Sequence, residues 1–267
     1  MVVKLVALDI DGTVVRHDEN TPRPEVANAI GELVGLGVAV VLASGRMFPG
    51  TAAIANQLGL STPLICQQGC GIHSRDGALL HSVPIDRKTA LSLVSLAREL
   101  GYPYEWFNPV RYLVSEETPE AREYGRVSGI EPEFGANPED SGVEPTGVGI
   151  ISNRRDARSV KSRVDTAHGD RLHVLDFPSV TVAVSARASK AHALALLCGE
   201  MGVDRSSVIA VGDSVNDASM LEWAGVGFAM ANADRYAAAA ADEMLPDEPD
   251  ALGNLLESLV RARRSRG

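Results

Sequence analysis

The sequence is poor in aromatic residues and has no long apolar run. Only 4% of its 267 residues are aromatic although 45% are hydrophobic, so Val, Leu and Ala must fill most of a core. No charge-free apolar run reaches about 18 residues, the length that a transmembrane helix needs. The first residues form a strand-like segment that contains Lys4, which does not fit a secretory signal peptide. We therefore expect a globular, cytoplasmic protein without a membrane partner.

Cysteine and positive charge are also scarce. Cys66, Cys70 and Cys198 are an odd number without zinc-ligand spacing, which favours buried, reduced thiols over disulfides. The 35 acidic and 25 basic residues give a formal net charge of -10. Nucleic acids require a clustered basic face, whereas the one basic cluster here lies at the C-terminal end. We expect no nucleic-acid partner.

The sequence does contain a pair of carboxylates directly after an apolar, strand-like run. Residues 2–8 lead into the segment Asp9 to Thr13, and the carboxyl end of a strand is where open α/β sheets bind ligands. Side chains alternate along a strand, so Asp9 and Asp11 share one side. They repel each other unless a cation lies between them or one is protonated. A plain turn remains possible, whereas a calcium loop is disfavoured because its closing position is Asn20 rather than Glu.

Other apolar runs deliver polar loops in the same way. Residues 38–43 end in Ser44-Gly45-Arg46, and residues 207–211 end in the segment Gly212 to Asp217. Lys190 opens an amphipathic segment over residues 191–201, near a helix N-terminus, where anions are favoured. Each piece alone also fits a turn, a solvated lysine or a helix cap. Together they predict a site for a phosphate group and a metal.

In this order the segments resemble the four motifs of the haloacid dehalogenase superfamily, which are here Asp9 to Thr13, Ser44, Lys190, and Gly212-Asp213 with Asn216-Asp217. The resemblance spans nearly the whole chain and is strongest to the Cof-type sugar-phosphatase branch. Two departures stand out. Gln68-Gly69 replaces the usual Asn-Gly, and Ala231-Asn232-Ala233 replaces Gly-Asn-Ala. Neither replaces a catalytic group, but both make it less safe to carry over a relative's substrate.

The resemblance implies an α/β fold, with a Rossmann-like doubly wound parallel sheet as the core and an inserted α+β cap domain of the C2 type. The spacing agrees, because one helix, expected to start at Thr21, fits between Asp11 and Ser44, whereas well over a hundred residues separate Ser44 from Lys190. We predict a core of residues 1–83 and 187–267 and a cap of residues 84–186. The expected elements are a third core strand over 63–67, a hairpin over 71–83, cap helices over 86–100, 120–127 and 154–167, cap strands near 104 and 112 and over 148–152, 172–177 and 180–184, and a long loop over 129–147.

For phosphate-ester hydrolysis, the resemblance implies Mg²⁺ and a covalent intermediate. Mg²⁺ prefers hard oxygen ligands, which we assign to the side chains of Asp9 and Asp213 and to the Asp11 backbone carbonyl. Asp9 is expected to form an aspartyl-phosphate, while Asp11 exchanges protons with the leaving alcohol and with water. The residues expected to bind phosphate or substrate are Thr13, Ser44, Gly45, Lys190 and Asn216, with Arg46 either joining them or forming a structural salt bridge, and Asp217 orienting Lys190 and metal-bound water.

The sequence thus predicts a phosphatase that acts on a small phosphorylated metabolite, by default a sugar phosphate. Phosphoglycolate and pyridoxal phosphate are alternative substrates. A phosphomutase would use the same aspartyl-phosphate but usually lacks Ser-Gly-Arg, and a non-catalytic phosphate sensor would not need both Asp9 and Asp11. The sequence does not distinguish a monomer from a homodimer, and the cap residues give no readable code for the leaving group.

Overall fold

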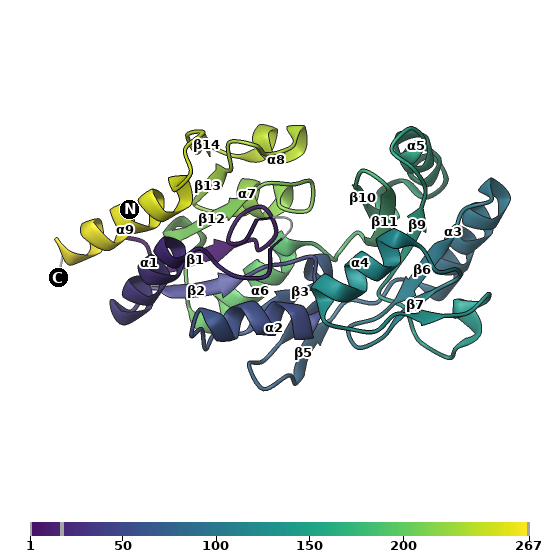
Figure 1. The fold of residues 1–267 in the computed structure, drawn as a ribbon, viewed down its shortest axis with the longest axis horizontal. Helices are drawn as coiled ribbons and strands as arrows, with labels where there is room; N and C mark the ends of the chain where they lie inside the picture. The colour runs from purple at the N-terminus through teal and green to yellow at the C-terminus, as the bar shows by residue number, and fades with distance from the viewer. Residues whose placement is uncertain (1, 17–18, 266–267) are drawn as a thin grey trace.

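The computed structural model describes residues 2–16 and 19–265 and contains two lobes that lie side by side (Figure 1). The first lobe combines the beginning and the end of the chain, and the second is formed by its middle, drawn in teal. We call them the core and the cap. None of the helices in the described ranges is long and apolar enough to cross a membrane.

The core contains a parallel sheet in which an inner strand, β1, is buried on both faces. The strand order is β14-β13-β12-β1-β2, and every neighbouring pair is parallel. All residues of β1 are inaccessible to solvent, which explains why its sequence is a continuous apolar run rather than an alternating one. The strands are β1 Leu5–Leu8, β2 Ala39–Leu42, β12 Val208–Gly212, β13 Val226–Ala229 and β14 Glu243–Met244.

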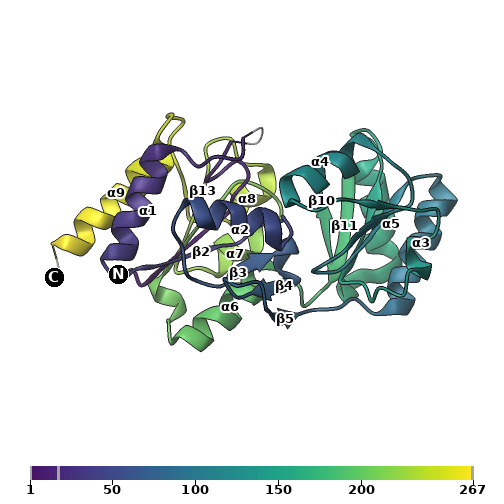
Figure 2. The same cartoon turned by 60° about the horizontal axis from the view of Figure 1, so that its bottom comes forward.

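Helices cover both faces of this sheet, as a doubly wound fold requires (Figure 2). Val6 and Leu8 pack with α1, α2 and α9, whereas Leu5 and Ala7 pack with α6, α7 and α8. The bounds are α1 Pro24–Gly35, α2 Phe48–Gln57, α6 Lys190–Met201, α7 Ala218–Trp223, α8 Arg235–Ala240 and α9 Ala251–Arg264, with a 3-10 turn at Arg205–Ser207.

The first helix starts later than the sequence predicted. We expected Thr21 to open it, but α1 begins at Pro24 and Arg23 is its N-cap, with φ -64° and ψ 138°. A proline disfavours the helical conformation in the residue before it, so Arg23 is extended and the helix cannot begin earlier. Pro24 itself fits the first helical position, where no intrahelical N–H bond is needed.

The predicted third core strand is present, but it belongs mainly to a separate antiparallel sheet. Its link to the core sheet is a single parallel bridge between Ala43 and Ile65. The strand ends where Gln67 and Gln68 both adopt positive φ, at 48° and 62°. The expected hairpin follows and turns at Gly77, whose φ is 94°. The sheet contains β3 Leu64–Cys66, β4 Gly71–His73 and β5 Leu79–Ser82, with a 3-10 turn at Gln67–Gly69.

The cap contains a six-stranded sheet of order β10-β11-β9-β6-β7-β8, antiparallel except for the pair β7 and β8. Helices α3 and α5 pack on one face, and α4 packs on the other, towards the core (Figure 1). The elements are α3 Arg87–Leu100, β6 Tyr104–Phe107, β7 Tyr112–Val114, α4 Pro119–Ser128, β8 Glu133–Phe134, β9 Gly147–Ile151, α5 Ala157–His168, β10 Leu172–Asp176 and β11 Val180–Ser185, with 3-10 turns at Pro138–Asp140 and Gly169–Arg171.

Two details of the cap differ from the expectation. The helix expected from residue 154 begins at Ala157, because Asn153 forms a turn with Oδ1 accepting from the amides of Arg155 and Asp156. The stretch 129–147, expected to be a loop, contains β8 and a 3-10 turn. Apart from these additions the predicted cap helices and strands are present in the predicted order.

The cap docks on the core through the loop that follows β2. The Tyr124 hydroxyl donates to the Gly45 carbonyl at 3.1 Å, and the Met47 amide donates to Ser128 Oγ at 3.2 Å. Gly50, in the first turn of α2, has no room for a side chain, since a Cβ there would lie 2.2 Å from the carbonyl oxygen of Val127. The two lobes therefore meet through backbone atoms at close range.

Candidate active site

Three loops at the carboxyl ends of neighbouring parallel strands converge on one cavity. Asp9 and Asp11 follow β1, Gly45 and Arg46 follow β2, and Asp213 follows β12. These strands are adjacent because β1 lies between β12 and β2. Polar loops that are far apart in sequence therefore reach one point, as the strand-end pattern predicted.

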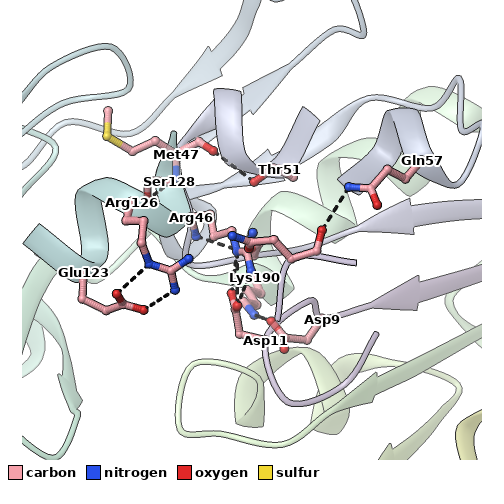
Figure 3. Close-up of polar contacts among 12 residues, drawn as sticks. Asp9, Asp11, Arg46, Met47, Thr51, Gln57, Glu123, Arg126, Ser128 and Lys190 are labelled. Atoms are coloured by element: carbon pink, nitrogen blue, oxygen red, sulfur yellow. Dashed lines mark hydrogen bonds and ion pairs between the residues drawn. The ribbon is translucent and has the colours of Figure 1, made fainter. Parts of the chain in front are cut away.

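Lys190 lies beneath this cavity and is completely buried. Its Nζ donates to Asp9 Oδ1 at 2.6 Å (Figure 3). It also donates to Asp217 Oδ1 at 2.6 Å. Burial disfavours the ammonium charge, but Asp217 and Asp9 outweigh it and raise the pKa of Lys190 above its usual value. The lysine starts α6, and Gly69 lets the loop after β3 approach this helix, because a Cβ there would lie 2.2 Å from the Ser189 carbonyl oxygen.

Asp9 carries a strongly perturbed carboxyl group. Burial, followed by the charge of Asp217, raises its pKa well above the ordinary value, and Lys190 opposes that shift. Asp9, Asp213 and Asp217 can each place one oxygen so that all three lie within 4.8 Å of one another. Hard oxygen donors of this kind suit Mg²⁺ rather than a thiophilic metal.

The charges around Asp9 are predominantly negative. Asp9, Asp11 and Asp217 are three carboxylates that share two cations, Lys190 and Arg46. Asp213 adds a further carboxylate within metal-ligating distance of Asp9 and Asp217. A divalent ion would offset this excess of negative charge, so the residues present fit Mg²⁺.

Asp217 was predicted to orient Lys190, and its contacts match that arrangement. Oδ1 accepts from Lys190, and Oδ2 accepts from the amides of Asp213 and Ser214, each at 3.0 Å. Both oxygens are therefore engaged, although the carboxylate lies within reach of a metal. Gly212 makes room for it, since a Cβ there would lie 2.4 Å from Asp217 Cγ.

Arg46 forms a salt bridge with Asp11, one of the two arrangements that the sequence left open. Its Nε lies 2.9 Å from Asp11 Oδ2 and its Nη2 lies 2.5 Å from Oδ1 (Figure 3). Ser44 Oγ accepts from the Arg46 amide at 3.1 Å, and the buried Thr13 Oγ1 has no hydrogen-bond partner among the described residues.

Asn216 contacts Gln68, the residue that departs from the family pattern. Asn216 Nδ2 donates to Gln68 Oε1 at 2.6 Å, while its own Oδ1 accepts from Ser214 Oγ at 2.6 Å. Gln68 Nε2 lies against Gly45, where a Cβ would be 2.6 Å away. Asn216 therefore holds a side chain that lines the core side of the cavity, a contact that sequence reasoning did not predict.

The cavity between the lobes has a volume of about 560 Å³. The sequence predicted that the cap would face the leaving group but named no residue for this contact. Glu105 is the most notable cap residue here, because it is only 6% exposed and burial raises its pKa to about 7. The cap residues that line the cavity are Glu105, Phe107, Glu120, Tyr124, Val127, Asp176, Phe177, Pro178, Val180 and Val182.

All three cysteines are buried and unpaired, as predicted, and none lines this cavity. Burial raises the pKa of Cys66 and of Cys70 to about 12 and that of Cys198 to about 11. They are packing residues rather than reactive thiols.

Comparison with known proteins gives consistent matches over nearly the whole chain. Residues 6–253 match the family model described as haloacid dehalogenase-like hydrolase. The chain is 31% identical to the phosphoglycolate phosphatase of Natronomonas pharaonis, over 98% of each protein. It is 27% identical to phosphatase YwpJ of Bacillus subtilis, over 97% of this chain and all of that protein. The structure matches that of the HAD subclass IIB sugar phosphatase BT4131 with a TM-score of 0.82, covering 96% of this chain and 98% of the other at 17% identity. These matches confirm the predicted fold class and the resemblance drawn from the four motifs.

Proposed function

Since this chain belongs to the haloacid dehalogenase-like hydrolase family and is a phosphatase, we propose that it hydrolyses a small phosphomonoester by covalent transfer of the phosphoryl group to Asp9. The observation that carries this proposal is the way Asp9 is held. Lys190 binds Oδ1, whereas Oδ2 has no donor among the described residues, and Asp9 lines the cavity. A nucleophile needs this combination of a fixed carboxylate and one free oxygen.

Mg²⁺ is the proposed cofactor, held by the side chains of Asp9 and Asp213 and by the Asp11 backbone carbonyl. When bound, it would neutralise charge on the phosphoryl group, whose repulsion otherwise blocks attack by a carboxylate. Lys190 supplies a positive charge of the protein beside Asp9, and its hydrogen bond to Oδ1 orients the carboxylate.

In the first step Asp9 Oδ2 attacks phosphorus while the bond between phosphorus and the leaving oxygen breaks. The leaving oxygen takes a proton from Asp11 and departs as an alcohol. In the second step water attacks the aspartyl-phosphate, gives its proton to Asp11 and releases inorganic phosphate from Asp9. Each step thus returns Asp11 to the protonation state that the other one needs.

Asp11 must carry a proton when the alcohol leaves, yet Arg46 holds it as an ion pair. We therefore propose that a bound phosphate dianion recruits Arg46, because phosphate matches the guanidinium fork as well as a carboxylate does. Asp11 then loses its cationic partner when its proton is needed. Thr13 Oγ1, Ser44 and the Gly45 amide are proposed to bind the remaining phosphoryl oxygens.

The substrate class is proposed from relatives. The structure matches that of the sugar phosphatase BT4131, and this match supports a sugar phosphate as the first candidate. The phosphoglycolate phosphatase at 31% identity supports phosphoglycolate as the second candidate. A phosphate-release screen with Mg²⁺ over a panel of phosphomonoesters tests the activity directly.

The intermediate has its own test. The leaving group of p-nitrophenyl phosphate needs no proton, so Asp11→Asn should still form the aspartyl-phosphate from this ester but hydrolyse it slowly. Acid-quenched protein should then carry one phosphoryl group on Asp9, detected by peptide mass spectrometry. If Asp9→Asn released phosphate at the normal rate, covalent transfer to Asp9 would be excluded.

A further inference from the structure

The cap wall of the cavity is acidic and apolar. Its charged residues are Glu105, Glu120 and Asp176, and no cap residue that lines the cavity is basic. The other cap residues there are aliphatic or aromatic, and they include Phe107, Tyr124 and Phe177. The leaving group of a substrate must fit between these side chains when its phosphate lies at Asp9.

Glu105 is the most deeply buried of these carboxylates. Oε1 accepts a hydrogen bond from the Tyr112 hydroxyl at 2.6 Å, and Oε2 has no donor among the described residues. The fold leaves space for it, because a Cβ at Gly149 would lie 2.0 Å from Oε2. Burial and then the charge of Glu120 raise its pKa, and only the Tyr112 hydrogen bond opposes the shift. The ionised form of a buried carboxylate with one neutral partner is costly unless a cation joins it.

The neighbouring cations already have carboxylate partners. Arg46 is bound to Asp11, and Arg126 on α4 donates to both oxygens of Glu123, at 2.8 and 2.6 Å (Figure 3). Arg126 does not line the cavity. No described residue therefore supplies the positive charge that Glu105 and Glu120 lack.

We propose that the substrate supplies this charge, and that the enzyme prefers phosphomonoesters whose leaving group bears an ammonium group, bound by Glu105 and Glu120. This inference rests on the proposed phosphatase function and names the substrate class of the same site. The aromatic rings of the wall support it, because their faces attract cations. A leaving group with a carboxylate or a second phosphate would instead face like charges without a partner.

A matched series of small esters tests the charge preference. 2-Aminoethyl phosphate, 2-hydroxyethyl phosphate and 2-phosphoglycolate share a two-carbon leaving group that is cationic, neutral or anionic. We expect kcat/KM at pH 7.5 with Mg²⁺ to fall in that order, by at least about tenfold between the first and the last, since a charge-assisted contact has this strength. Glucosamine 6-phosphate and glucose 6-phosphate make a larger pair in which the amine should again be preferred.

Two variants locate the preference in the cap. Glu105→Gln keeps the shape of the side chain and its contact with Tyr112. Glu120→Gln changes a partly exposed side chain that can be replaced without disturbing the packed interior of the cap. Each should lower kcat/KM for 2-aminoethyl phosphate more than that for 2-hydroxyethyl phosphate, so that the ratio of the two values falls by about tenfold. Glu116→Gln, an exposed carboxylate of the cap outside the cavity, is the matched control and should change neither value.

The outcomes separate this inference from the function on which it rests. If p-nitrophenyl phosphate is hydrolysed but phosphoglycolate is preferred over the amine, the ammonium preference is wrong. Loss of that phosphoglycolate activity in Arg126→Gln would further show that Arg126 leaves Glu123 to bind a carboxylate. If no ester is hydrolysed, p-nitrophenyl phosphate included, the proposed phosphatase chemistry itself is overturned, and the inference with it.

Discussion

The core and cap walls of the cavity both bury carboxylates, but they compensate them differently. In the core, Lys190 bonds to Asp9 and Asp217 and Arg46 bonds to Asp11, so these carboxylates are fixed by cations of the protein. In the cap, Glu105 has only the neutral Tyr112 as a partner among the described residues. In the proposed function, the core binds the phosphate that all substrates share. In the proposed substrate preference, the leaving group supplies the positive charge that the cap lacks.

The largest expected effect falls on the core side. Asp9→Asn should reduce turnover at least about 10⁴-fold while leaving the protein folded, because the change removes a covalent nucleophile. Steady-state kinetics with p-nitrophenyl phosphate measures the loss, and circular dichroism checks the fold. Turnover close to that of the wild type would mean that the core carboxylates have another role.

Removing the metal should affect every substrate equally, because its proposed ligands all lie in the core. Chelation should abolish phosphate release, and added Mg²⁺ should restore it. Excess Ca²⁺ should inhibit, since its higher coordination number allows a carboxylate to bind through both oxygens and would occupy the attacking oxygen of Asp9. If activity persisted in the presence of chelator, a metal would not be needed to offset the excess negative charge of the core carboxylates.

The raised pKa of Glu105 in the cap predicts that the stability of the protein depends on pH. The pKa of Glu105 is about 7 in the folded protein against 4.5 as its ordinary value, so the folded state holds its proton more tightly. Its contribution to stability is fully present below pH 4.5 and is lost as the pH rises through about 7, up to roughly 3 kcal/mol. Glu105→Gln should remove this loss of stability. The midpoint of urea-induced unfolding should therefore fall less between pH 5 and pH 8 in the variant than in the wild type. An identical fall in both proteins would show that Glu105 ionises freely.

The smallest expected effect concerns the contact between the lobes. Gly50→Ala should displace α4, because its Cβ would meet the Val127 backbone, and should raise KM several-fold for larger substrates more than for p-nitrophenyl phosphate. Gly31→Ala in α1 is the control, because nothing lies within 4 Å of a Cβ there. It should leave kinetics unchanged and stabilise the protein by about 0.5–1 kcal/mol. Equal kinetics in both variants would show that the cap accommodates the displacement.

The difference between the lobes also explains what could be predicted from sequence. Asp9, Ser44 and Asp213 follow apolar strands closely, and parallel strands bring such positions together, so the convergence of these loops could be predicted from the sequence. Lys190 could be found because it opens a helix in the expected order. The start of α1 could not be placed from the usual cap preference of Thr21, because the restriction that Pro24 imposes on Arg23 outweighs that preference.

The cap side of the site could not be predicted for a physical reason. Glu105 lies on a strand and Tyr124 on a helix, and neither stands in a motif. Nothing in the local pattern of β6 distinguishes a buried glutamate from one that faces solvent. Only the pairing of β6 with β9, which sets Glu105 opposite Gly149, shows that space is kept for its carboxylate. Gln68 departs from the family pattern in the sequence, but its contact with Asn216 depends on loops 148 residues apart.

The hydrogen bond from Tyr124 to the Gly45 carbonyl has a consequence for product release. Gly45 belongs both to the contact with the cap and to the loop proposed to bind phosphate. Any coupling between cap closure and phosphate binding through this shared loop is reciprocal. If closure of the cap raises the affinity for phosphate, bound phosphate must favour the closed form by the same factor. Bound inorganic phosphate would then slow its own release. Opening of the cap, rather than a chemical step, would limit the rate of the catalytic cycle.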